Sequence, residues 1–469
     1  MVGQFWGREK ELSLMKSLYN GPGSVFLRIY GRRRIGKTQL VQRFLSEIQG
    51  KSLYYYVDLA EDAVLLKTMA DAIFQQLNEK VVLRTWDDLF AYIAELARER
   101  FVLAIDEAPR FLDSRSIFLT RLQLAWDTIP GLKNTKLMIL IIGSSIGMME
   151  KIIGRNGPLY GRVTHTIKLK PLDYYEFRQA FPELQEHDRI LHYAAFGGTP
   201  HYVLAARNER GTVMDKIEKL MVTPQAALSY EAEQLFVAES IREPARYVSI
   251  LRAIASGKVE LNEIQAETGI QKEQLPVYLK RLDKLLDIVR SADPIGGKKK
   301  NARYTVSDNF FNFWFRFIFP NRSSIEIGNT RDALEKIGSQ LKMHAGGTFE
   351  QIASELLTLY QNRDIDGTHI LFDRIGKWWN RKGDEIDIVA THFKTGTVYI
   401  ADVLYSMEEY KPVDLEILQM RIKLLGFPGV YRLILISRSG FSEQVVAEAQ
   451  RTGIALVDLK KLSELFDAA

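Results

Sequence analysis

Short apolar segments alternate with amphipathic helical segments through roughly the first 210 residues of the chain. The short segments are rich in branched or aromatic residues and span 24–30, 52–59, 101–106 and 136–143. Between them, 38–48 and 61–80 carry apolar residues at the spacing of one helix face. Strands that alternate with helices predict an α/β domain, in which a parallel sheet is covered by helices on both faces.

Helices dominate the next part of the chain. The apolar spacing predicts three of them, over 246–257, 261–267 and 273–286. Pro276 is compatible with the third helix only in its first turn. Two strand-like segments, 288–292 and 303–307, then flank a basic loop. Three helices followed by a hairpin with a basic tip are typical of a winged helix.

The last part of the chain follows an aromatic stretch, 309–320, which we expect to be buried. Five strand-like segments come after it, at 368–375, 385–393, 397–404, 431–437 and 453–458. They alternate with two helical segments, 414–425 and 443–452. This pattern indicates a second α/β unit, so the expected domains are 1–210, 211–325 and 326–469.

The composition is that of an ordinary globular protein, with 46% hydrophobic and 26% charged residues. A formal net charge of +5 is compatible with a nucleic-acid partner without indicating one. The absence of cysteine excludes disulfides, thiol catalysis and cysteine-ligated metals. No apolar run approaches the ~20 residues of a membrane span, and the first residues lack the apolar core of a signal peptide. We therefore expect a cytoplasmic protein without a membrane partner.

One loop carries a specific phosphate-binding motif. It matches G-x-x-x-x-G-K-[ST], follows a predicted strand and opens a predicted helix, which is the context that the motif requires. Its lysine is expected to reach the β- and γ-phosphates of ATP, and its threonine hydroxyl to bind Mg²⁺. The backbone amides would surround the phosphates. The expected ATP-binding residues are Gly31, Arg32, Arg33, Arg34, Ile35, Gly36, Lys37, Thr38 and Gln39.

A second motif supports the first one. The apolar strand Phe101–Asp106 ends in Asp106 and Glu107, an acidic pair about seventy residues after the loop. Asp106 is expected to hold Mg²⁺ through water, and Glu107 to act as the general base on the attacking water. The next strand ends in Ser144 and Ser145, which either sense the γ-phosphate or cap the following helix.

These motifs and several others together resemble the archaeal-type AAA+/STAND P-loop ATPases. The resemblance rests on FWGREKE at 5–11, GRRRIGKT at 31–38, LAIDEAPRF at 103–111, PLYGR at 158–162 and GGTP at 197–200. It implies an ATP-driven switch, with the FWGRE segment near the adenine. It also makes Arg162 a candidate to contact a γ-phosphate, in cis or across a subunit interface, although a surface salt bridge is an equal alternative.

The C-terminal unit resembles the PD-(D/E)-x-K nucleases. The resemblance places Glu350, Asp387 and Asp402 at the carboxylate positions, where they could bind Mg²⁺. Leu404 stands at the position of the lysine that orients water and stabilises negative charge. We therefore expect an inactive nuclease fold kept as a binding or assembly module, with an ATP-regulated nuclease as the alternative.

Two roles for the whole chain follow from these parts. In the first, ATP controls a protein that binds DNA through the winged helix and its basic wing. The basic residues concerned are Lys280, Arg281, Lys284, Lys298, Lys299, Lys300 and Arg303. In the second, the chain is a STAND-type signalling or scaffold ATPase that binds a protein partner. Both allow ATP-dependent self-association.

Overall fold

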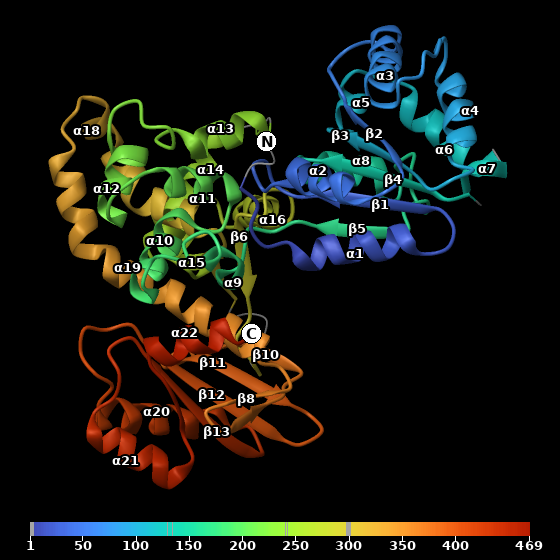
Figure 1. Cartoon of the computed structure of the whole chain (residues 1–469). Helices are drawn as coiled ribbons and strands as arrows, with labels where there is room; N and C mark the ends of the chain where they lie inside the picture. The colour runs from blue at the N-terminus through green and yellow to red at the C-terminus, as the bar shows by residue number, and fades with distance from the viewer. Residues whose placement is uncertain (1–3, 129, 134, 240, 242, 297–301) are drawn as a thin grey trace. The chain divides into compact units, whose positions relative to one another are not determined.

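Five parallel strands form the sheet of the N-terminal unit in the computed structural model of the chain (Figure 1). The structure describes all residues except 1–3, 129, 134, 240, 242 and 297–301. The strand order is β2-β3-β4-β1-β5. The strands are β1 (Val25–Tyr30), β2 (Lys51–Tyr56), β3 (Phe101–Asp106), β4 (Leu137–Gly143) and β5 (His165–Lys168). The predicted parallel α/β fold is confirmed.

Helices cover both faces of this sheet, and an apolar core fills each side. The helices of this unit are α1 (Glu9–Asn20), α2 (Lys37–Glu47), α3 (Asp62–Leu77), α4 (Trp86–Leu96), α5 (Arg110–Asp113), α6 (Phe118–Thr128), α7 (Pro130–Lys133) and α8 (Ile146–Ile153). Side chains of α1 and α2 pack on one face, and those of α3, α4, α5, α6 and α8 pack on the other. The central strands β3 and β4 are buried along their whole length, which explains their uninterrupted apolar sequences.

The chain divides into two compact units, and each unit combines segments that are separated in the sequence. The first unit comprises Met1–Pro171, Thr199–His201 and Lys284–Leu286, and the second comprises Leu172–Gly198, Tyr202–Asp283 and Asp287–Ala469. Residues 172–198, which the sequence joins to the ATPase-like part, therefore belong with the second unit. The predicted division into three domains remains a prediction.

The first part of the second unit is helical. Its elements are α9 (Tyr174–Arg178), α10 (Glu186–Phe196), α11 (Pro200–Asn208) from Tyr202 onwards, α12 (Val213–Ile217), η1 (Glu218–Val222) and α13 (Glu231–Ala238). Three helices and an antiparallel hairpin follow, α14 (Pro244–Ala255), α15 (Leu261–Thr268), α16 (Leu275–Lys284), β6 (Val289–Ala292) and β7 (Arg303–Val306). Pro276 lies in the first turn of α16, as its missing N–H requires.

The aromatic stretch is buried, as predicted, and forms α17 (Asn309–Phe313), η3 (Trp314–Ile318) and η4 (Phe319–Asn321). It leads through α18 (Arg322–Glu326) into the long helix α19 (Arg331–Leu359). The Trp314 indole N–H donates to the Ser229 carbonyl at 3.2 Å, which satisfies a polar group in a largely apolar interior.

The C-terminal sheet has mixed strand directions, in the order β10-β11-β12-β13-β14. Its strands are β10 (Arg374–Trp379), β11 (Glu385–His392), β12 (Thr397–Leu404), β13 (Val430–Ser437) and β14 (Ala455–Val457), and a small hairpin, β8 (Arg363–Ile365) and β9 (Thr368–Ile370), precedes them. The pairs β10/β11 and β11/β12 are antiparallel, and the remaining pairs are parallel. Its helices are α20 (Pro412–Leu425), α21 (Glu443–Thr452) and α22 (Leu459–Asp467).

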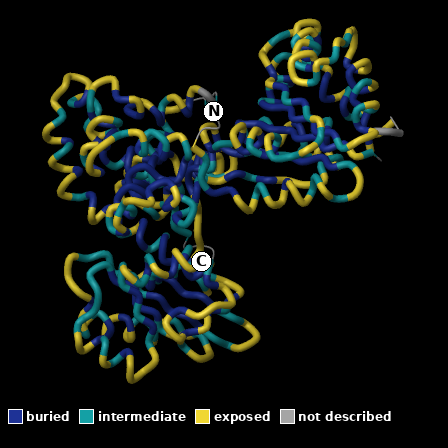
Figure 2. Tube along the Cα trace, in the orientation of Figure 1, coloured by how far each residue is buried: buried dark blue, intermediate teal, exposed yellow. Residues whose placement is uncertain are grey.

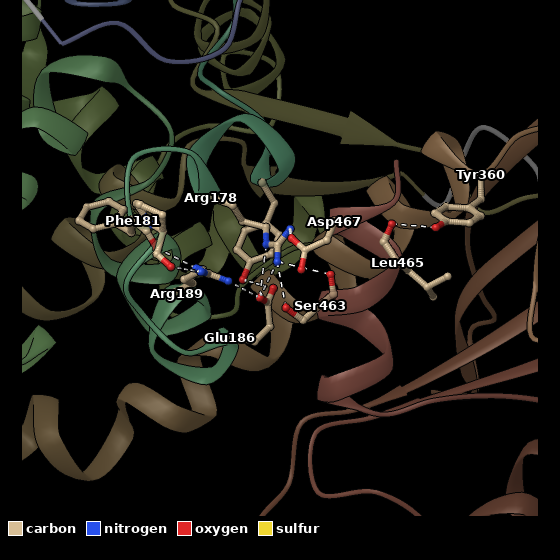
Figure 3. Close-up of polar contacts among 10 residues, drawn as sticks. Arg178, Phe181, Glu186, Arg189, Tyr360, Ser463, Leu465 and Asp467 are labelled. Carbon is tan, nitrogen blue, oxygen red and sulfur yellow. Dashed lines mark hydrogen bonds and ion pairs between the residues drawn. The ribbon is translucent and has the colours of Figure 1, made fainter.

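An ion-pair network centred on the buried Arg178 and Glu186 connects the last helix to the start of the second unit (Figure 3). The Arg178 guanidinium pairs with Glu186 at 3.2 Å and with Asp467 at 3.0 Å, and it donates to the Ser463 hydroxyl at 3.0 Å. Arg189 also pairs with Glu186, at 2.9 Å. The network joins α9 and α10 to α22, so the chain's final helix is an integral part of this unit.

Burial follows the sheets in both units, with dark strands beneath helices whose outer faces are exposed (Figure 2). Among the described residues, no helix is both long and apolar enough to span a membrane.

Candidate functional site

The loop between β1 and α2 has the backbone geometry of a phosphate cradle. Gly36 adopts a left-handed conformation (φ 89°) directly before α2 begins at Lys37. Gly31 has φ 155°, and a Cβ at this position would lie 2.5 Å from the Leu169 carbonyl oxygen. A side chain at 31 would therefore push the loop away from the segment that follows β5. The loop ends at the helix N-terminus, where free amides and the helix dipole favour an anion.

The ammonium group of Lys37 lies inside the curve of this loop. Its Nζ donates to the Gly31 carbonyl at 2.9 Å and to the Arg32 carbonyl at 2.8 Å, and the residue is 5% exposed. Phosphate binding requires backbone amides and a positive charge close together. The loop meets this requirement, because it surrounds the Lys37 ammonium and also presents the amides.

The other predicted loop residues are divided between the interior and the surface. Ile35 is buried, whereas Arg33, Arg34 and Gln39 are exposed. Arg32 is buried, and its Nη2 donates to the Thr199 hydroxyl at 3.1 Å. Thr199 belongs to the GGTP segment, so this segment contacts the loop through a side chain that the sequence pattern did not reveal.

Arg8, in the FWGRE segment, also supports the loop and was not predicted to do so. Its Nη2 donates to the Ile35 carbonyl at 3.3 Å and to the Lys170 carbonyl at 2.6 Å, and the residue is 4% exposed. It has φ 71°, which is unfavourable for an arginine and marks a constrained position. The guanidinium thus ties the loop to the segment after β5.

The carboxylate of Asp106 meets the loop at the carboxyl ends of the strands. Its Oδ2 accepts from the Thr38 hydroxyl at 2.6 Å and from the Tyr54 hydroxyl at 2.7 Å. Its Oδ1 accepts from the Glu107 amide at 2.8 Å. Burial, followed by the charge of Asp106, raises the pKa of the Tyr54 hydroxyl, so this group remains a donor. Sequence reasoning missed Tyr54, although it lies in the second half of β2, the strand beside β3, where an aromatic hydroxyl can reach Asp106.

Glu107 adopts a left-handed conformation (φ 54°), which directs its side chain away from the course of β3. Its Oε1 accepts a hydrogen bond from the Ser144 hydroxyl at 2.5 Å. Ser145 caps α8 by accepting from the Met148 amide at 3.4 Å. Ser145 therefore caps the helix, which is one of the two roles expected for this serine pair. Ser144 instead contacts Glu107, the predicted base.

Arg162 lies away from the loop. It pairs with Asp127 at 2.7 Å, and its Nη1 donates to the Tyr160 carbonyl at 2.6 Å. It precedes β5 near the start of β1, since Thr164 bonds to Phe26. The loop follows the opposite end of the six-residue strand β1, about 20 Å away. The prediction that Arg162 contacts a γ-phosphate in cis is therefore wrong, because Arg162 and the loop lie at opposite ends of the sheet. A contact across a subunit interface remains a prediction.

The predicted carboxylates of the C-terminal domain surround a lysine. Lys377 Nζ lies 2.9 Å from Glu350, 3.6 Å from Asp387 and 3.6 Å from Glu385. Lys377 lies on β10. The part of β11 opposite Lys377 forms a bulge, and this bulge contains Asp387. The expectation that this cluster lacks a cation is therefore wrong, because a lysine from the neighbouring strand supplies it.

Asp402 lies next to the group, and its Oδ2 accepts from the Tyr410 hydroxyl at 2.7 Å. Among the residues that the structure describes, no set of three or more histidine, aspartate or glutamate side chains is arranged to hold a metal ion. Asp387 lies close enough to Glu350 and Asp402 for its charge to raise the pKa of both, while Lys377 pairs with Glu350 and Asp387, so metal binding by these three carboxylates stays a prediction.

Burial sets the protonation of this cluster. Burial, with the charge of Asp387, raises the pKa of Glu350 to about 7 against the opposing effect of Lys377. Burial, again with the charge of Asp387, raises the pKa of Asp402 to about 6. For Lys377, burial lowers the pKa, but the carboxylates around it outweigh burial and raise it overall. The lysine is therefore charged near neutral pH.

The predicted DNA-contacting residues have different surroundings. Lys280 is exposed on α16, whereas Arg281 donates to the Tyr247 hydroxyl at 3.2 Å. Arg303 pairs with Glu385 at 3.0 Å and lies over the Trp379 ring at 5.0 Å. It is thus held within the unit instead of projecting from a wing. Lys298, Lys299 and Lys300 lie outside the described residues.

Two family models match the chain. Residues 5–205, which contain the whole loop site, match an ATPase domain found predominantly in Archaea. Residues 314–413 match a family described as archaeal and bacterial proteins of unknown function.

One relative and several solved structures are similar to the chain. The uncharacterized protein MJECL04 of Methanocaldococcus jannaschii is 32% identical over 390 residues, covering 82% of this chain and 84% of that protein. The Walker-type ATPase PABY2304 of Pyrococcus abyssi has a similar fold, with a TM-score of 0.51 and 21% identity, over 66% of this chain and 96% of that one. The ORC2 protein of Aeropyrum pernix is more distant, with a TM-score of 0.44 and 14% identity over 72% of this chain and 96% of that one. The chain therefore belongs to the same family as the uncharacterized M. jannaschii protein, and its phosphate-binding loop and ATPase domain match make it an archaeal-type P-loop ATPase.

Proposed function

We propose that the chain is a magnesium-dependent ATPase whose nucleotide state controls an association with DNA. The observation that carries the magnesium-dependent step is the 2.6 Å contact between the Thr38 hydroxyl and the Asp106 carboxylate beside the loop. Hydroxyl and carboxylate oxygens are ligands that Mg²⁺ prefers. These two come from parts of the chain that are well separated in sequence, the first turn of α2 and the end of β3.

Each group has a distinct part in hydrolysis. The loop amides and Lys37 would bind and neutralise the β- and γ-phosphates, and Thr38 and Asp106 would hold the metal. Bound magnesium would supply positive charge that offsets the charge of the phosphates. Glu107 would take the proton from water as the water oxygen bonds to the γ-phosphorus and the bond to the β-γ bridging oxygen breaks, leaving ADP and phosphate.

The contact between Glu107 and Ser144 supports slow turnover. A carboxylate that accepts a 2.5 Å hydrogen bond from Ser144 must exchange this partner for water before it acts as a base. Breaking a hydrogen bond to a charged group costs roughly 1.5–3 kcal/mol. This agrees with a nucleotide-dependent switch more than with a rapid motor.

Turnover measured against magnesium concentration tests the proposal. Wild-type chain should hydrolyse ATP only with a divalent metal, and Asp106→Asn should need much more magnesium for half-maximal rate. Glu99→Gln, a change at an exposed position of the same unit, is the control. Metal-independent turnover, or an Asp106→Asn variant with an unchanged magnesium requirement, would contradict the assignment.

The DNA association rests on the helical part of the second unit. Three helices followed by an antiparallel hairpin occur here in the order of a winged helix, with Lys280 exposed on the third helix. Arg281 and Arg303 have partners within the unit, so Lys280 is the described residue that supports the proposal, and the sequence alone adds the lysines at 298–300. Salt-dependent binding of duplex DNA, weakened by replacing those three lysines with alanine, is the expected result. A wild-type chain that binds no duplex would favour the scaffold alternative.

We further propose that the C-terminal domain does not cleave DNA. Two observations support this: Leu404 stands at the expected lysine position, and Lys377 pairs with Glu350 and Asp387, so it would compete with a divalent ion for them. Incubating plasmid DNA with the chain, with Mg²⁺ or Mn²⁺ and with or without ATP, should leave the DNA intact. Metal-dependent nicking that is lost in Asp387→Ala would instead favour the ATP-regulated nuclease, with Lys377 as the stabilising cation.

A further inference from the structure

Helix α20 carries a continuous apolar stripe on its outer face. Val413, Ile417, Met420 and Leu424 succeed one another at steps of four, three and four residues, which aligns them along one side of a helix. Their exposed fractions are 53%, 37%, 58% and 54%. Isolated exposed apolar residues are common on protein surfaces, but four in a line over three turns are not.

The core of the domain does not account for this stripe. Leu415 and Leu418, on the opposite side of α20, are buried in the apolar cluster between the helix and the sheet. The helix therefore has an inner apolar face that the fold uses and an outer one that it does not. The spacing of the outer face is that of a two-helix seam, in which each helix supplies residues at alternating steps of three and four.

Charged residues flank the stripe in an arrangement that selects its partner. The first half of α20 carries the acids Asp414 and Glu416, and the second half carries the bases Arg421 and Lys423. At 100° per residue, Glu416 and Lys423 lie on one side of the stripe, and Asp414 and Arg421 lie on the other.

We propose that α20 is a self-association surface, on which a second copy of this chain docks through its own α20 in antiparallel orientation. A twofold axis then places each flank of the stripe against the same flank of the second copy. Because the two helices run in opposite directions, the first half of one helix lies beside the second half of the other. Glu416 then faces Lys423 of the second copy, and both of these side chains are exposed. On the other flank, Asp414 accepts from the Lys411 amide and the charge of Arg421 acts on Asp387 and Asp402, so the exposed flank defines the pairing. In the same register Val413 meets Leu424, and Ile417 meets Met420.

Parallel pairing satisfies fewer of these charges. It brings Glu416 towards Arg421 of the second copy but leaves the exposed Lys423 without an acidic residue opposite it. It also aligns the two helix dipoles, which antiparallel pairing opposes favourably. A single helix pair is at the low end of specific interfaces, which bury about 1,200 Å² or more in total, so the dimer should dissociate in the micromolar range.

Sedimentation velocity of the full chain at about 1–100 µM tests the apolar seam, since an interface of this size dissociates within that range. Wild-type chain should show a reversible monomer–dimer equilibrium. Met420→Lys should raise the dissociation constant by at least about tenfold, because a charge at the centre of the seam cannot be paired. Met343→Lys, at a position that is 64% exposed on α19, is the matched control and should behave as wild type. A wild-type chain that stays monomeric throughout, or equal dimerisation by Met420→Lys, would overturn the proposal.

Charge reversal tests the orientation. Glu416→Lys should weaken the dimer by about tenfold, because symmetry places two like-charged contacts with Lys423 in the interface. Lys423→Glu should do the same through Glu416. The double variant Glu416→Lys/Lys423→Glu should recover wild-type affinity if the helices are antiparallel. Failure to recover would overturn the antiparallel arrangement, since in parallel pairing the new lysine at 416 would face Arg421.

Discussion

The phosphate-binding loop and the carboxylate cluster around Lys377 are both polar sites at the edges of α/β sheets, but they are built differently. The loop is one run of residues whose function depends on backbone conformation, with Gly36 in a left-handed conformation at the start of α2. The cluster takes Glu350 from α19, Lys377 from β10, and Asp387 from β11. A site made of backbone can be identified from a motif, whereas a site made of distant side chains depends on register.

The acidic residues of the two sites also differ in their partners. Asp106 is held by two neutral hydroxyls, from Thr38 and Tyr54, which can exchange for a metal ion without leaving a charge unpaired. Asp387 and Glu350 pair with the ammonium group of Lys377. A metal ion would have to displace this group, which would leave the lysine charge without its partners. This difference explains why we assign magnesium to the first site and not to the second.

The largest expected effect tests the base of the phosphate site. Glu107→Gln keeps the shape of the side chain but cannot accept the proton, so the rate of ATP turnover should fall about 10²–10⁴-fold while ATP affinity is retained. Single-turnover hydrolysis and nucleotide binding should be measured together, with Glu99→Gln as control. Turnover within a factor of about two of wild type would remove Glu107 from the mechanism.

The next effect concerns the cation of the same site. Lys37→Ala should weaken ATP binding roughly 100-fold or more, because the amides alone do not neutralise the β- and γ-phosphates. Titration with a fluorescent ATP analogue measures the loss. Lys10→Ala removes an exposed cation on α1, outside the loop, and should bind nearly normally. Equal affinities in the two variants would mean that the loop does not bind phosphate through Lys37.

The corresponding substitution in the carboxylate cluster is at Lys377. It should lower the stability of the fold by an amount that depends on pH. Lys377→Met removes the cation that stabilises Glu350 and Asp387 as carboxylates, and should lower the free energy of unfolding by about 1–3 kcal/mol at pH 8. The loss should be smaller at pH 5.5, because Glu350, whose pKa is raised to about 7 by burial and by the charge of Asp387, is then mostly protonated. A carboxyl with a raised pKa in the folded state destabilises the fold as pH rises from its unfolded value through that pKa.

Urea unfolding of wild type, Lys377→Met and the exposed control Lys382→Met at both pH values measures this difference. Destabilisation of equal size at pH 5.5 and pH 8 would show that Lys377 supports the domain by packing and not by its charge.

The smallest expected effect tests the neutral partner of Asp106. Tyr54→Phe removes a hydrogen bond of 2.7 Å that orients the carboxylate. The magnesium concentration for half-maximal turnover should rise about three- to tenfold, while the maximal rate stays nearly constant. Tyr56→Phe, at an exposed position of the same strand, is the control. A reduced maximal rate with an unchanged magnesium requirement would place Tyr54 in another role.

Sequence alone located most strands of both sheets within one or two residues, because buried strands need continuous apolar runs and the central strand Phe101–Asp106 has no polar interruption. It missed the edge strand His165–Lys168, where exposed polar residues alternate with few apolar ones. It also joined β9 and the start of β10 into one predicted strand, since the break at 371–373 carries no glycine or proline signal.

By itself, the sequence determined the parallel α/β fold, the phosphate-binding loop and the acidic pair at the end of β3. Each depends on local backbone preferences or on a short run of adjacent residues. Only the tertiary structure decided that Arg8 and Thr199 support the loop, that Arg162 lies at the other end of the sheet, and that Lys377 joins the carboxylates. Those outcomes depend on strand order and on the register of β10 against β11, where a bulge aligns Asp387 with a lysine. Register and strand order are set by the packing of the whole domain, which no local pattern specifies.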